Sequence, residues 1–556
     1  MSFGFVGVVL IGGAVTFSDD VGTTFKAVHR IAAPGVPSVR APLLGTPARY
    51  WVFFSDKAVA DDALQRALDQ RRNELSARAL QRRALRRTAP GLLDVHDIAV
   101  PQRYVDAVAA CGARVRRVSR WLNAVSVEAT SDQLRAIAAL PFVRGVRPLA
   151  RSAGPLPRPE TSPPDAGNGF DPRGVDPVFE GAAFDQLDQV GVVAAHTAGY
   201  TGAGVIIGIL DTGFRRTHDA FNQTASPAHA VQVLAEYDFV DDDPVTAPEA
   251  EDHPDQHVHG TLILGVLGAN YPFVLVGAAY DATFILAKTE DITQEVPLEE
   301  DQYVAGLEFI EALGGDVATS SLGYIDWYTQ ADLDGQTAVT TIAVNVATAN
   351  GVVCCTAAGN YGHDEDPATA RLIAPADAFR VLTCGSVRST GVISGFSSDG
   401  PSADGRVKPE VLARGTSTVT VDPYGDVGLV TASGTSLSTP VVAGVAALVV
   451  QAHPDWTVDK VRRALFHTAN DFLANADYDA TYVRGYGIVS AMEAILFVHS
   501  DINGDDLADG DDIAPFMSAL AGLNADADQR RRADVNADGV VDTADVPVFV
   551  ADLLGE

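Results

Sequence analysis

Between residues 205 and 213 the sequence reads Val205-Ile206-Ile207-Gly208-Ile209-Leu210-Asp211-Thr212-Gly213, an unbroken apolar run that ends in a carboxylate and a glycine. A short apolar run bounded by turn residues is typical of a strand that is buried on both faces. Similar runs follow at residues 283–287, 317–321, 352–356 and 381–387, and residues 302–313 have the apolar spacing of a helix. Strands that alternate with helices predict an α/β fold, in which a parallel sheet has helices on both faces. We therefore expect catalytic groups near the carboxyl ends of these strands.

Three short motifs carry an Asp, a His and a Ser, in that order. Asp211 ends the first strand, and His259-Gly260-Thr261 opens an apolar helix. Ser436 stands within Gly434-Thr435-Ser436-Leu437-Ser438-Thr439-Pro440, directly before another helix. A serine hydroxyl becomes a strong nucleophile only when an imidazole takes its proton, and a buried carboxylate must orient that imidazole. Each residue alone has a plainer reading, as a turn residue, a structural histidine or a helix cap. Their order and context together predict a catalytic triad of Asp211, His259 and Ser436.

These motifs resemble the Asp, His and Ser blocks of the subtilisin-like serine proteases, which occur in the same order. A fourth block, Ala357-Ala358-Gly359-Asn360, follows the strand at residues 352–356. The resemblance implies that Asn360 donates its side-chain amide to a tetrahedral oxyanion, with the backbone N–H of Ser436 as the second donor. Ser321-Leu322-Gly323 resembles the family's substrate-binding strand. By the same resemblance, Leu322 and Gly323, with Ala357, Ala358 and Gly359, border an apolar pocket for the side chain before the scissile bond.

Residues 49–150 have the pattern of a small α+β domain. Strands are expected at residues 50–54, 124–127 and 143–146. A long helix is expected after the first strand, up to about Arg87, and further helices at residues 104–111 and 131–140, the last capped by Ser131 or Asp132. The domain resembles the inhibitory propeptide of the same protease family, most clearly at residues 122–127 and 143–148, which implies a ferredoxin-like fold. An accessory domain that is never cleaved is the alternative.

Charge is distributed unevenly along the chain. The whole sequence has a net charge of −32, yet residues 21–155 carry 22 Lys and Arg against 10 Asp and Glu. A basic N-terminal part and an acidic remainder are expected to attract each other, although one arginine-rich solvated helix could also account for the difference. The acidic balance argues against nucleic acid as a partner, because phosphate binding requires clustered Lys and Arg.

Two further segments flank the N-terminal domain. Residues 151–183 are rich in Pro, Gly and Asp, and we interpret them as an exposed linker in which maturation cleavage takes place. The apolar run at residues 3–15 resembles the core of a secretion signal within residues 1–20, and a buried strand is the alternative.

No stretch is long enough to predict a membrane span. Four cysteines form no disulfide framework; buried thiols are expected, with a bridge to Cys384 as the alternative.

The C-terminal part, residues 500–556, contains an internal repeat with an offset of 33 residues. Asp501-Ile502-Asn503-Gly504-Asp505 recurs as Asp534-Val535-Asn536-Ala537-Asp538. Oxygen ligands at this spacing are typical of Ca²⁺ loops. The expected ligands of the first loop are Asp501, Asn503, Asp505, the Leu507 carbonyl, Asp509 and Asp512, and those of the second are Asp534, Asn536, Asp538, the Val540 carbonyl, Asp542 and Asp545. Each loop is followed by a helix without a clear one before it, which resembles a small all-α dockerin repeat. The resemblance implies a cohesin-type partner; a tail that binds Ca²⁺ alone is the alternative.

Together these patterns predict a secreted, extracellular serine endopeptidase, attached to the cell surface if the tail has such a partner. It acts on polypeptides without a catalytic cofactor and is made as a precursor inhibited by its own propeptide. Residues 184–499 are assigned to the peptidase domain. A non-catalytic binding or scaffolding protein on the same fold is the main alternative, and a processing protease that cuts a single partner is another.

Overall fold

The computed structural model describes residues 47–149, 178–222, 230–293, 300–325, 328–475, 477–504, 507–523, 526–536 and 539–554. The predicted secretion signal lies outside these residues, as does most of the predicted linker. Residues 178–183, at the end of that linker, pack on the large domain: the Ala182 N–H donates to the Val274 carbonyl at 2.9 Å, and Gly181 forms an antiparallel bridge with Leu275.

A seven-stranded sheet in the order β13-β12-β11-β10-β5-β9-β6 forms the centre of the large domain. Every pairing along it is parallel, which confirms the predicted α/β class. The strands are β5 (Ile206–Asp211), β6 (Gln232–Asp238), β9 (Thr283–Lys288), β10 (Val317–Ser320), β11 (Val353–Ala357), β12 (Leu382–Val387) and β13 (Val411–Arg414).

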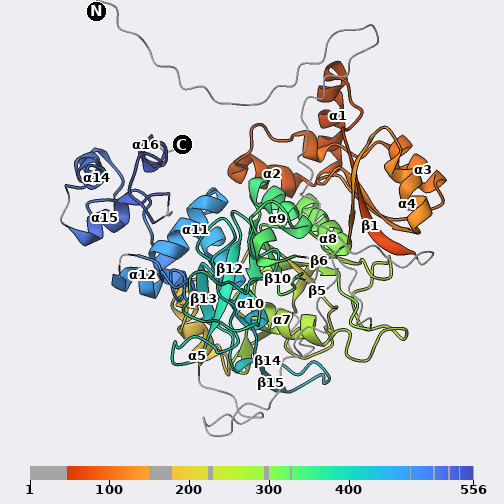
Figure 1. Ribbon diagram of the computed structural model, residues 1–556. Helices are drawn as coiled ribbons and strands as arrows, with labels where there is room; N and C mark the ends of the chain where they lie inside the picture. The colour runs from red at the N-terminus through yellow and green to blue at the C-terminus, as the bar shows by residue number, and fades with distance from the viewer. Residues whose placement is uncertain are drawn as a thin grey trace, which may run out of the picture.

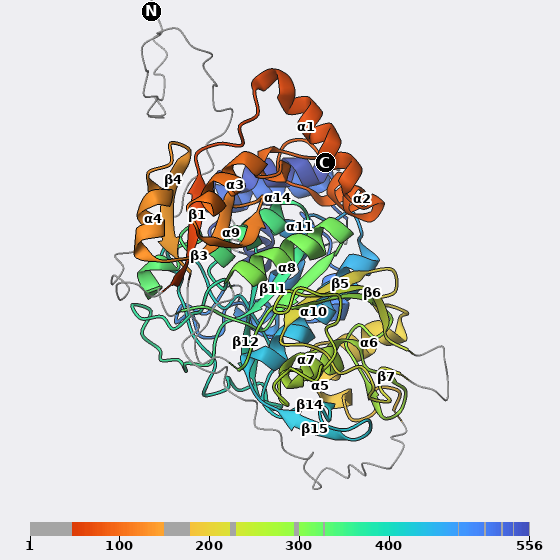
Figure 2. The same cartoon turned by 90° about the vertical axis from the view of Figure 1, so that its right-hand side faces the viewer.

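Helices cover both faces of this sheet (Figures 1 and 2). Helices α7 (Val258–Gly268) and α10 (Thr435–Ala452) contribute to one buried apolar cluster, and α8 (Glu300–Leu313) and α9 (Val339–Ala349) to another. Contrary to the expectation that no stretch is long enough for a membrane span, α10 is long and apolar enough, the one such helix among those of the described residues. However, 89% of it is buried inside the molecule. The smaller elements are α5 (Phe184–Asp188), α6 (Val192–Thr197), β7 (Asn270–Tyr271), β8 (Leu275–Val276), β14 (Thr418–Val421), β15 (Leu429–Ala432), α11 (Val458–His467), α12 (Asn470–Asn475) and α13 (Ala491–Ile495).

The N-terminal domain has a four-stranded antiparallel sheet in the order β2-β3-β1-β4. Its strands are β1 (Ala48–Phe54), β2 (Arg114–Ser119), β3 (Ala124–Ala129) and β4 (Val143–Pro148). Side chains alternate between the two faces of a strand, so Tyr50, Val52 and Phe54 pack with α3 (Gln102–Ala110) and α4 (Ser131–Ala138), while Trp51 and Phe53 pack against the large domain.

Two details of this domain differ from the expectation. The long helix expected up to Arg87 is two helices, α1 (Asp61–Glu74) and α2 (Ala77–Arg86), because Ser76 is extended and its side chain accepts the Ala79 N–H at 3.0 Å, which starts a new helix. Helix α4 is capped by Thr130 and not by Ser131 or Asp132; Thr130 and Gln133 each accept the other's backbone N–H.

The C-terminal part contains α14 (Ile513–Leu520), α15 (Ala527–Ala533) and α16 (Asp545–Leu554), which lie beside the large domain (Figure 1). Phe516 and Phe549, which occupy matching positions of the 33-residue repeat, stack with their ring centroids 4.0 Å apart. Arg463 of α11 pairs with Asp552 of α16 at 3.1 Å, so the tail is tied to the large domain.

All four cysteines are free thiols, and the possible bridge to Cys384 is not formed. Cys354 and Cys355 lie in different apolar clusters, as neighbours on one strand must.

Candidate active site

Asp211 and His259 form a buried pair at the carboxyl end of the sheet. Asp211 is the last residue of β5, and His259 lies in the first turn of α7. His259 Nδ1 lies 2.7 Å from Asp211 Oδ1, and the carboxylate is fully buried. The same oxygen also accepts the Thr212 N–H at 2.8 Å, which fixes the carboxylate.

Small residues allow α7 to approach β5 this closely. A methyl group on Gly260 would lie 2.3 Å from the Gly213 carbonyl oxygen and 3.1 Å from Asp211 Cβ. The Gly260 N–H, which lacks a partner within its own helix, donates to the Thr212 hydroxyl at 3.2 Å. The residues that follow Asp211 and His259 in their motifs therefore join the two segments.

The environment of His259 changes its pKa. Burial lowers the pKa of His259, but the Asp211 carboxylate, through its charge and its hydrogen bond, outweighs burial and raises it. The Glu290 carboxylate adds to the rise. Glu290 is buried and accepts the Tyr324 hydroxyl at 2.6 Å. No sequence motif identified Glu290, which lies after the end of β9 and comes near His259 only through the strand order.

Ser436 is the second residue of α10 and is 8% exposed. Its hydroxyl donates to the Ser321 carbonyl at 3.5 Å, and the Ser321 hydroxyl donates to the Ser436 carbonyl at 2.8 Å. The start of α10 is thus attached to the segment that follows β10. This attachment brings the predicted nucleophile and the predicted substrate-binding strand together.

Asn360 is oriented by the residue that precedes Ser436. The Thr435 N–H and hydroxyl donate to Asn360 Oδ1 at 2.8 and 3.0 Å, so Nδ2 remains on the other side of the amide. A methyl group on Gly434 would lie 3.6 Å from Asn360 Nδ2 and 3.6 Å from the Ser436 backbone nitrogen. The two nitrogens therefore border one space, as donors to a single oxyanion must.

Ile373 lies against one glycine in each of the two segments predicted to border the substrate pocket. A methyl group on Gly323 would lie 2.1 Å from Ile373 Cδ1, and one on Gly359 would lie 3.3 Å from Ile373 Cγ2. The Ile373 N–H donates to the Ala358 carbonyl at 3.2 Å, and the next residue, Ala374, bridges to Tyr324. Sequence reasoning missed Ile373, because only the folded chain brings it between residues 323 and 359.

The two loops of the tail share one pattern of hydrogen bonds. Asp512 accepts the N–H of Asn503 with Oδ1 at 2.9 Å and that of Asp509 with Oδ2 at 2.8 Å. Asp545 accepts the N–H of Asn536 with Oδ1 at 3.1 Å and that of Asp542 with Oδ2 at 2.8 Å. Both carboxylates are fully buried, and each is held in place by backbone N–H groups of its own loop.

The other predicted ligands divide into two groups. Asp505 and Asp538 lie outside the described residues, while Asp501, Leu507, Asp534 and Val540 lie in the two loops. Arg532 pairs with Asp501 at 3.0 Å, so a cation in the first loop would share that carboxylate with a guanidinium.

A third acidic group was not predicted. Asp238, Asp243 and Glu249 each offer one oxygen within 4.8 Å of the others. Lys288 already lies 2.7 Å from Asp238 Oδ2 and neutralises part of this charge.

Comparison with known proteins agrees with this geometry. Residues 202–488 match the model of the Subtilase family, and residues 49–161 match the Peptidase S8 propeptide domain of Bacteroidota. Subtilisin E of Bacillus subtilis (strain 168) is 30% identical over 312 residues, which cover 55% of this chain and 70% of that protein. Subtilisin of Bacillus pumilus is also 30% identical over 312 residues, which cover 97% of it.

A solved structure shows the same fold. Fervidolysin from Fervidobacterium pennivorans, a keratinolytic enzyme related to subtilisin, superposes with a TM-score of 0.53 at 19% identity, covering 84% of this chain and 65% of that one. The predicted propeptide is thus supported by a domain match of its own, and the predicted peptidase domain by family, relatives and fold. The chain belongs to the subtilase family of serine peptidases and carries a propeptide domain of that family.

Proposed function

We propose that the chain is the precursor of a secreted serine endopeptidase whose catalytic residues are Ser436, His259 and Asp211, with Asn360 as an oxyanion donor. The observation that carries this proposal is the buried hydrogen bond between His259 Nδ1 and Asp211 Oδ1. Ser436 lies at the start of α10, which shares an apolar cluster with the helix of His259. A carboxylate in this position fixes the tautomer of the imidazole and stabilises its protonated form.

The reaction follows from the roles of these atoms. His259 Nδ1 is bonded to Asp211, so Nε2 takes the proton of the Ser436 hydroxyl as its oxygen attacks the peptide carbonyl. The carbonyl oxygen becomes an oxyanion and accepts hydrogen bonds from Asn360 Nδ2 and the Ser436 N–H. His259 then gives the proton to the leaving amine, and an acyl-enzyme forms at Ser436. Water, deprotonated by His259, hydrolyses this ester and restores the serine.

The Ser436→Ala variant of the whole chain tests this proposal. We expect the wild-type chain to lose its N-terminal part by a cut within residues 150–183, as followed by intact mass, and the variant to remain whole. Mixing the variant with a trace of active wild-type chain distinguishes cutting within one molecule from cutting between molecules. If both chains are cut alike when expressed and purified separately, another protease is responsible and the proposal fails.

We further propose that the pocket beside Gly323 and Gly359 accepts only small side chains, because the Ile373 side chain lies against both glycines. Peptides with Ala before the scissile bond should be cleaved faster than matched peptides with Phe. Ile373→Ala should raise kcat/KM for the Phe peptide at least about tenfold, since a single methylene group in a pocket contributes about 1–3 kcal/mol. Cleavage of the Ala peptide serves as the control and should change little. Equal rates for both peptides in the wild-type enzyme would contradict a narrow pocket.

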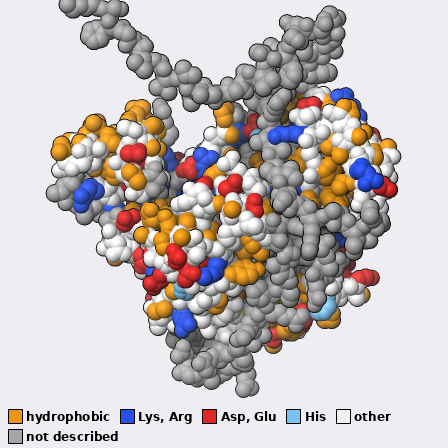
Figure 3. Space-filling view, in the orientation of Figure 1, with side chains coloured by type: hydrophobic (Ala, Val, Ile, Leu, Met, Phe, Trp, Pro, Cys, Tyr) orange, Lys and Arg blue, Asp and Glu red, His pale blue; other side chains and the backbone are white. Residues whose placement is uncertain are grey.

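For the tail we propose Ca²⁺ binding in both loops and attachment to a cohesin-type domain. Exposed apolar side chains support a partner: Leu507, Ile513, Met517, Leu523, Val540, Val550 and Leu554. Figure 3 shows apolar side chains gathered on this lobe. Titration of the Ser436→Ala chain with Ca²⁺ should give two sites, and Asp512→Ala and Asp545→Ala should each remove one. Titration heats unchanged in both variants would show that the loops do not hold the cation.

Export of the precursor is supported by the apolar run at residues 3–15. Expression of the whole chain in a bacterial host with a secretory pathway, followed by N-terminal sequencing of the extracellular protein, tests it. Retention of residues 3–15 in the extracellular protein would contradict a cleaved secretion signal.

A further inference from the structure

Helix α2 of the propeptide domain lies across the ends of two helices of the peptidase domain. The Ser76 N–H, just before α2, donates to the Ala312 carbonyl near the end of α8 at 3.2 Å. The Thr88 N–H, just after α2, donates to the Ala349 carbonyl at the end of α9 at 3.0 Å. Both ends of α2 are therefore tied to the peptidase domain by backbone hydrogen bonds.

Arg82 caps the carboxyl ends of both peptidase helices. Its Nη1 donates to the carbonyls of Glu311 and Gly315 at 3.1 and 2.7 Å, and its Nε donates to the Asn350 carbonyl at 3.2 Å. The last carbonyls of a helix have no partner within the helix, and they carry the negative end of its dipole. A guanidinium is matched to such a site in both charge and hydrogen-bonding capacity.

Two carboxylates of the peptidase domain complete the contact. Glu311 is bonded to Arg82 and, at 2.8 Å, to Arg83. Asp316 is bonded to Arg86 and, at 2.6 Å, to Arg78. Arg82, Arg83 and Arg86 are each at most 2% exposed, although arginine is seldom buried without a partner. Four arginines from one helix thus converge on two peptidase carboxylates.

The peptidase surface is also shaped for the backbone of α2. A methyl group on Gly314 would lie 2.6 Å from Arg78 Cγ, and one on Gly351 would lie 2.8 Å from Arg86 Cβ. Both glycines have positive φ, +100° and +87°, which independently favours glycine. Larger residues at either position would push α2 away from the peptidase domain.

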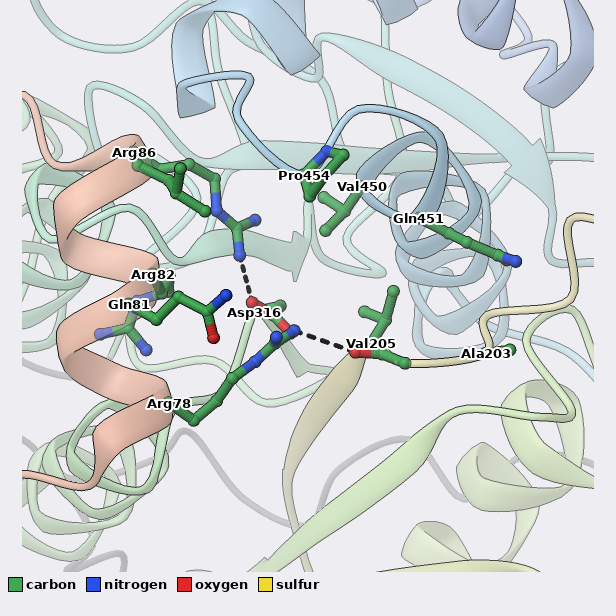
Figure 4. Close-up of a pocket in the computed structure, with 12 residues that line it drawn as sticks. Arg78, Gln81, Arg82, Arg86, Ala203, Val205, Asp316, Val450, Gln451 and Pro454 are labelled. Atoms are coloured by element: carbon green, nitrogen blue, oxygen red, sulfur yellow. Dashed lines mark hydrogen bonds and ion pairs between the residues drawn. The ribbon is translucent and has the colours of Figure 1, made fainter.

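Figure 4 shows how α2 meets this surface. Arg78 and Arg86 reach toward Asp316 along one side of a cavity of about 120 Å³, whose other side includes Val205, Val450 and Pro454. Paired charges therefore dominate this contact, whereas apolar packing dominates the contact of Trp51 and Phe53 with the peptidase domain.

We propose that Glu311, Gly314, Gly315, Asp316, Asn350 and Gly351 form a binding surface for an arginine-rich helix, here called the helix-end notch, and that α2 is its occupant. Asp316 directly precedes β10, whereas Ser321 directly follows it. The notch therefore lies at the amino ends of the parallel strands, and the candidate active site lies at their carboxyl ends. The notch therefore holds the propeptide by contacts that no substrate displaces. It keeps the propeptide bound after the linker is cut, a consequence that rests on the proposed function.

The Arg82–Glu311 pair gives a direct test, because Arg82 donates its hydrogen bonds to Glu311, Gly315 and Asn350, which all belong to the peptidase domain. Whole chains carrying Arg82→Ala, Glu311→Gln or both are allowed to cleave themselves. Release of the N-terminal fragment is then followed by size exclusion and by the rise of activity on dilution. Each single change should speed release at least about 30-fold, since truncating one member of a buried charged pair leaves the other unpaired. The double variant should release more slowly than the product of the two single effects predicts, because the Arg82–Glu311 pair is lost only once.

Arg72→Ala is the matched control, since Arg72 is an exposed arginine of α1. Its release rate should stay within about twofold of the wild-type rate, the size of an ordinary surface effect. Release at the wild-type rate in both single variants, or effects of the two changes that multiply fully, would overturn the proposal.

Hydrogen exchange covers the case in which a variant fails to mature or the wild-type chain does not cleave itself. In the Ser436→Ala background, Arg82→Ala should remove the protection of amides 77–86 while the amides of β10 and β11 stay protected. Unchanged protection of α2 would refute the notch whatever the catalytic activity. Failure of wild-type cleavage with loss of α2 protection would instead reject the proposed function and leave the notch in place.

Discussion

At the scale of single residues, the hydrogen bond from His259 to Asp211 predicts a large effect on turnover. Asp211→Asn should lower kcat by about 10⁴-fold, because the amide favours the wrong imidazole tautomer. Steady-state kinetics on a peptide substrate would measure the loss, and circular dichroism would show whether the variant stays folded. A folded variant with turnover within tenfold of the wild type would contradict the role of Asp211.

The raised pKa of His259 predicts the acid limb of the pH profile. Below this pKa the imidazole is protonated and cannot accept the Ser436 proton, so kcat/KM should fall as pH decreases. Burial lowers the pKa of His259, but the Asp211 carboxylate raises it by more than burial lowers it. The midpoint of the acid limb should therefore lie above the ordinary pKa of 6.5. A midpoint at or below 6.5 would show that burial, and not the carboxylate, determines the pKa.

Asn360 should affect the transition state more than substrate binding. Asn360→Ala removes one of the two donors beside Gly434 and should lower kcat by about 10²–10³-fold with little change in KM. A rise in KM of the same size with an unchanged kcat would indicate that Asn360 binds substrate instead.

At the scale of elements, the close contact between α7 and β5 predicts a stability effect. Gly260→Ala would place a methyl group 2.3 Å from the Gly213 carbonyl oxygen, so we expect a loss of about 1–3 kcal/mol in the free energy of unfolding. Urea denaturation of the Ser436→Ala chain would measure it without self-digestion. Gly395→Ala, where a methyl group would meet no atom within 4 Å, is the control and should be neutral. Equal stability of both variants would contradict the tight contact.

The buried elements could be predicted from the sequence, whereas the edges could not. Strands β5, β9, β10, β11 and β12 are continuous apolar runs, because helices cover both of their faces. Strand β6 lies at an edge of the sheet, and all of its residues except Asp238 are exposed or partly exposed. Strand β13 has only four residues, so neither strand gives an apolar run. Strand β2 is rich in arginine because Arg116 of this strand pairs with Asp301 of α8 at 2.9 Å. The contact of β2 with the peptidase domain thus places arginine where the apolar pattern of a strand would otherwise be expected.

The candidate site shows the same limit. The triad and Asn360 lie in short motifs that place each group at the end of a strand or the start of a helix. Ile373 and Glu290 have no such motif, because their positions depend on how distant segments cross.

At the scale of the whole molecule, the tail and the peptidase domain meet around buried histidines. Burial, together with the nearby Arg463, Arg531 and Arg532, lowers the pKa of His467 to about 3. Between pH 6.5 and about 3 the unfolded chain binds a proton there that the folded chain does not, so stability is present above this window and is lost as pH falls through it.

His467→Leu should therefore weaken the pH dependence of stability. Without this histidine, the Ser436→Ala chain should lose up to about 1.4 kcal/mol less per pH unit within the window. Urea denaturation at several pH values, with the chain that retains His467 as the reference, would measure the difference. Parallel pH dependences would show that His467 stays accessible to protons in the folded state.

The stacked rings of Phe516 and Phe549 have a consequence for the evolution and assembly of the tail. Each ring comes from one copy of the 33-residue repeat, and the two rings stack inside one apolar cluster that both copies share. Neither copy can therefore form its core alone, and the duplicated segment folds as one cooperative unit. Binding of a ligand in one loop would then strengthen ligand binding in the other loop. The coupling free energy is the same in both directions. Selection would act on the pair, so an insertion or truncation that removes one copy would abolish the function of both.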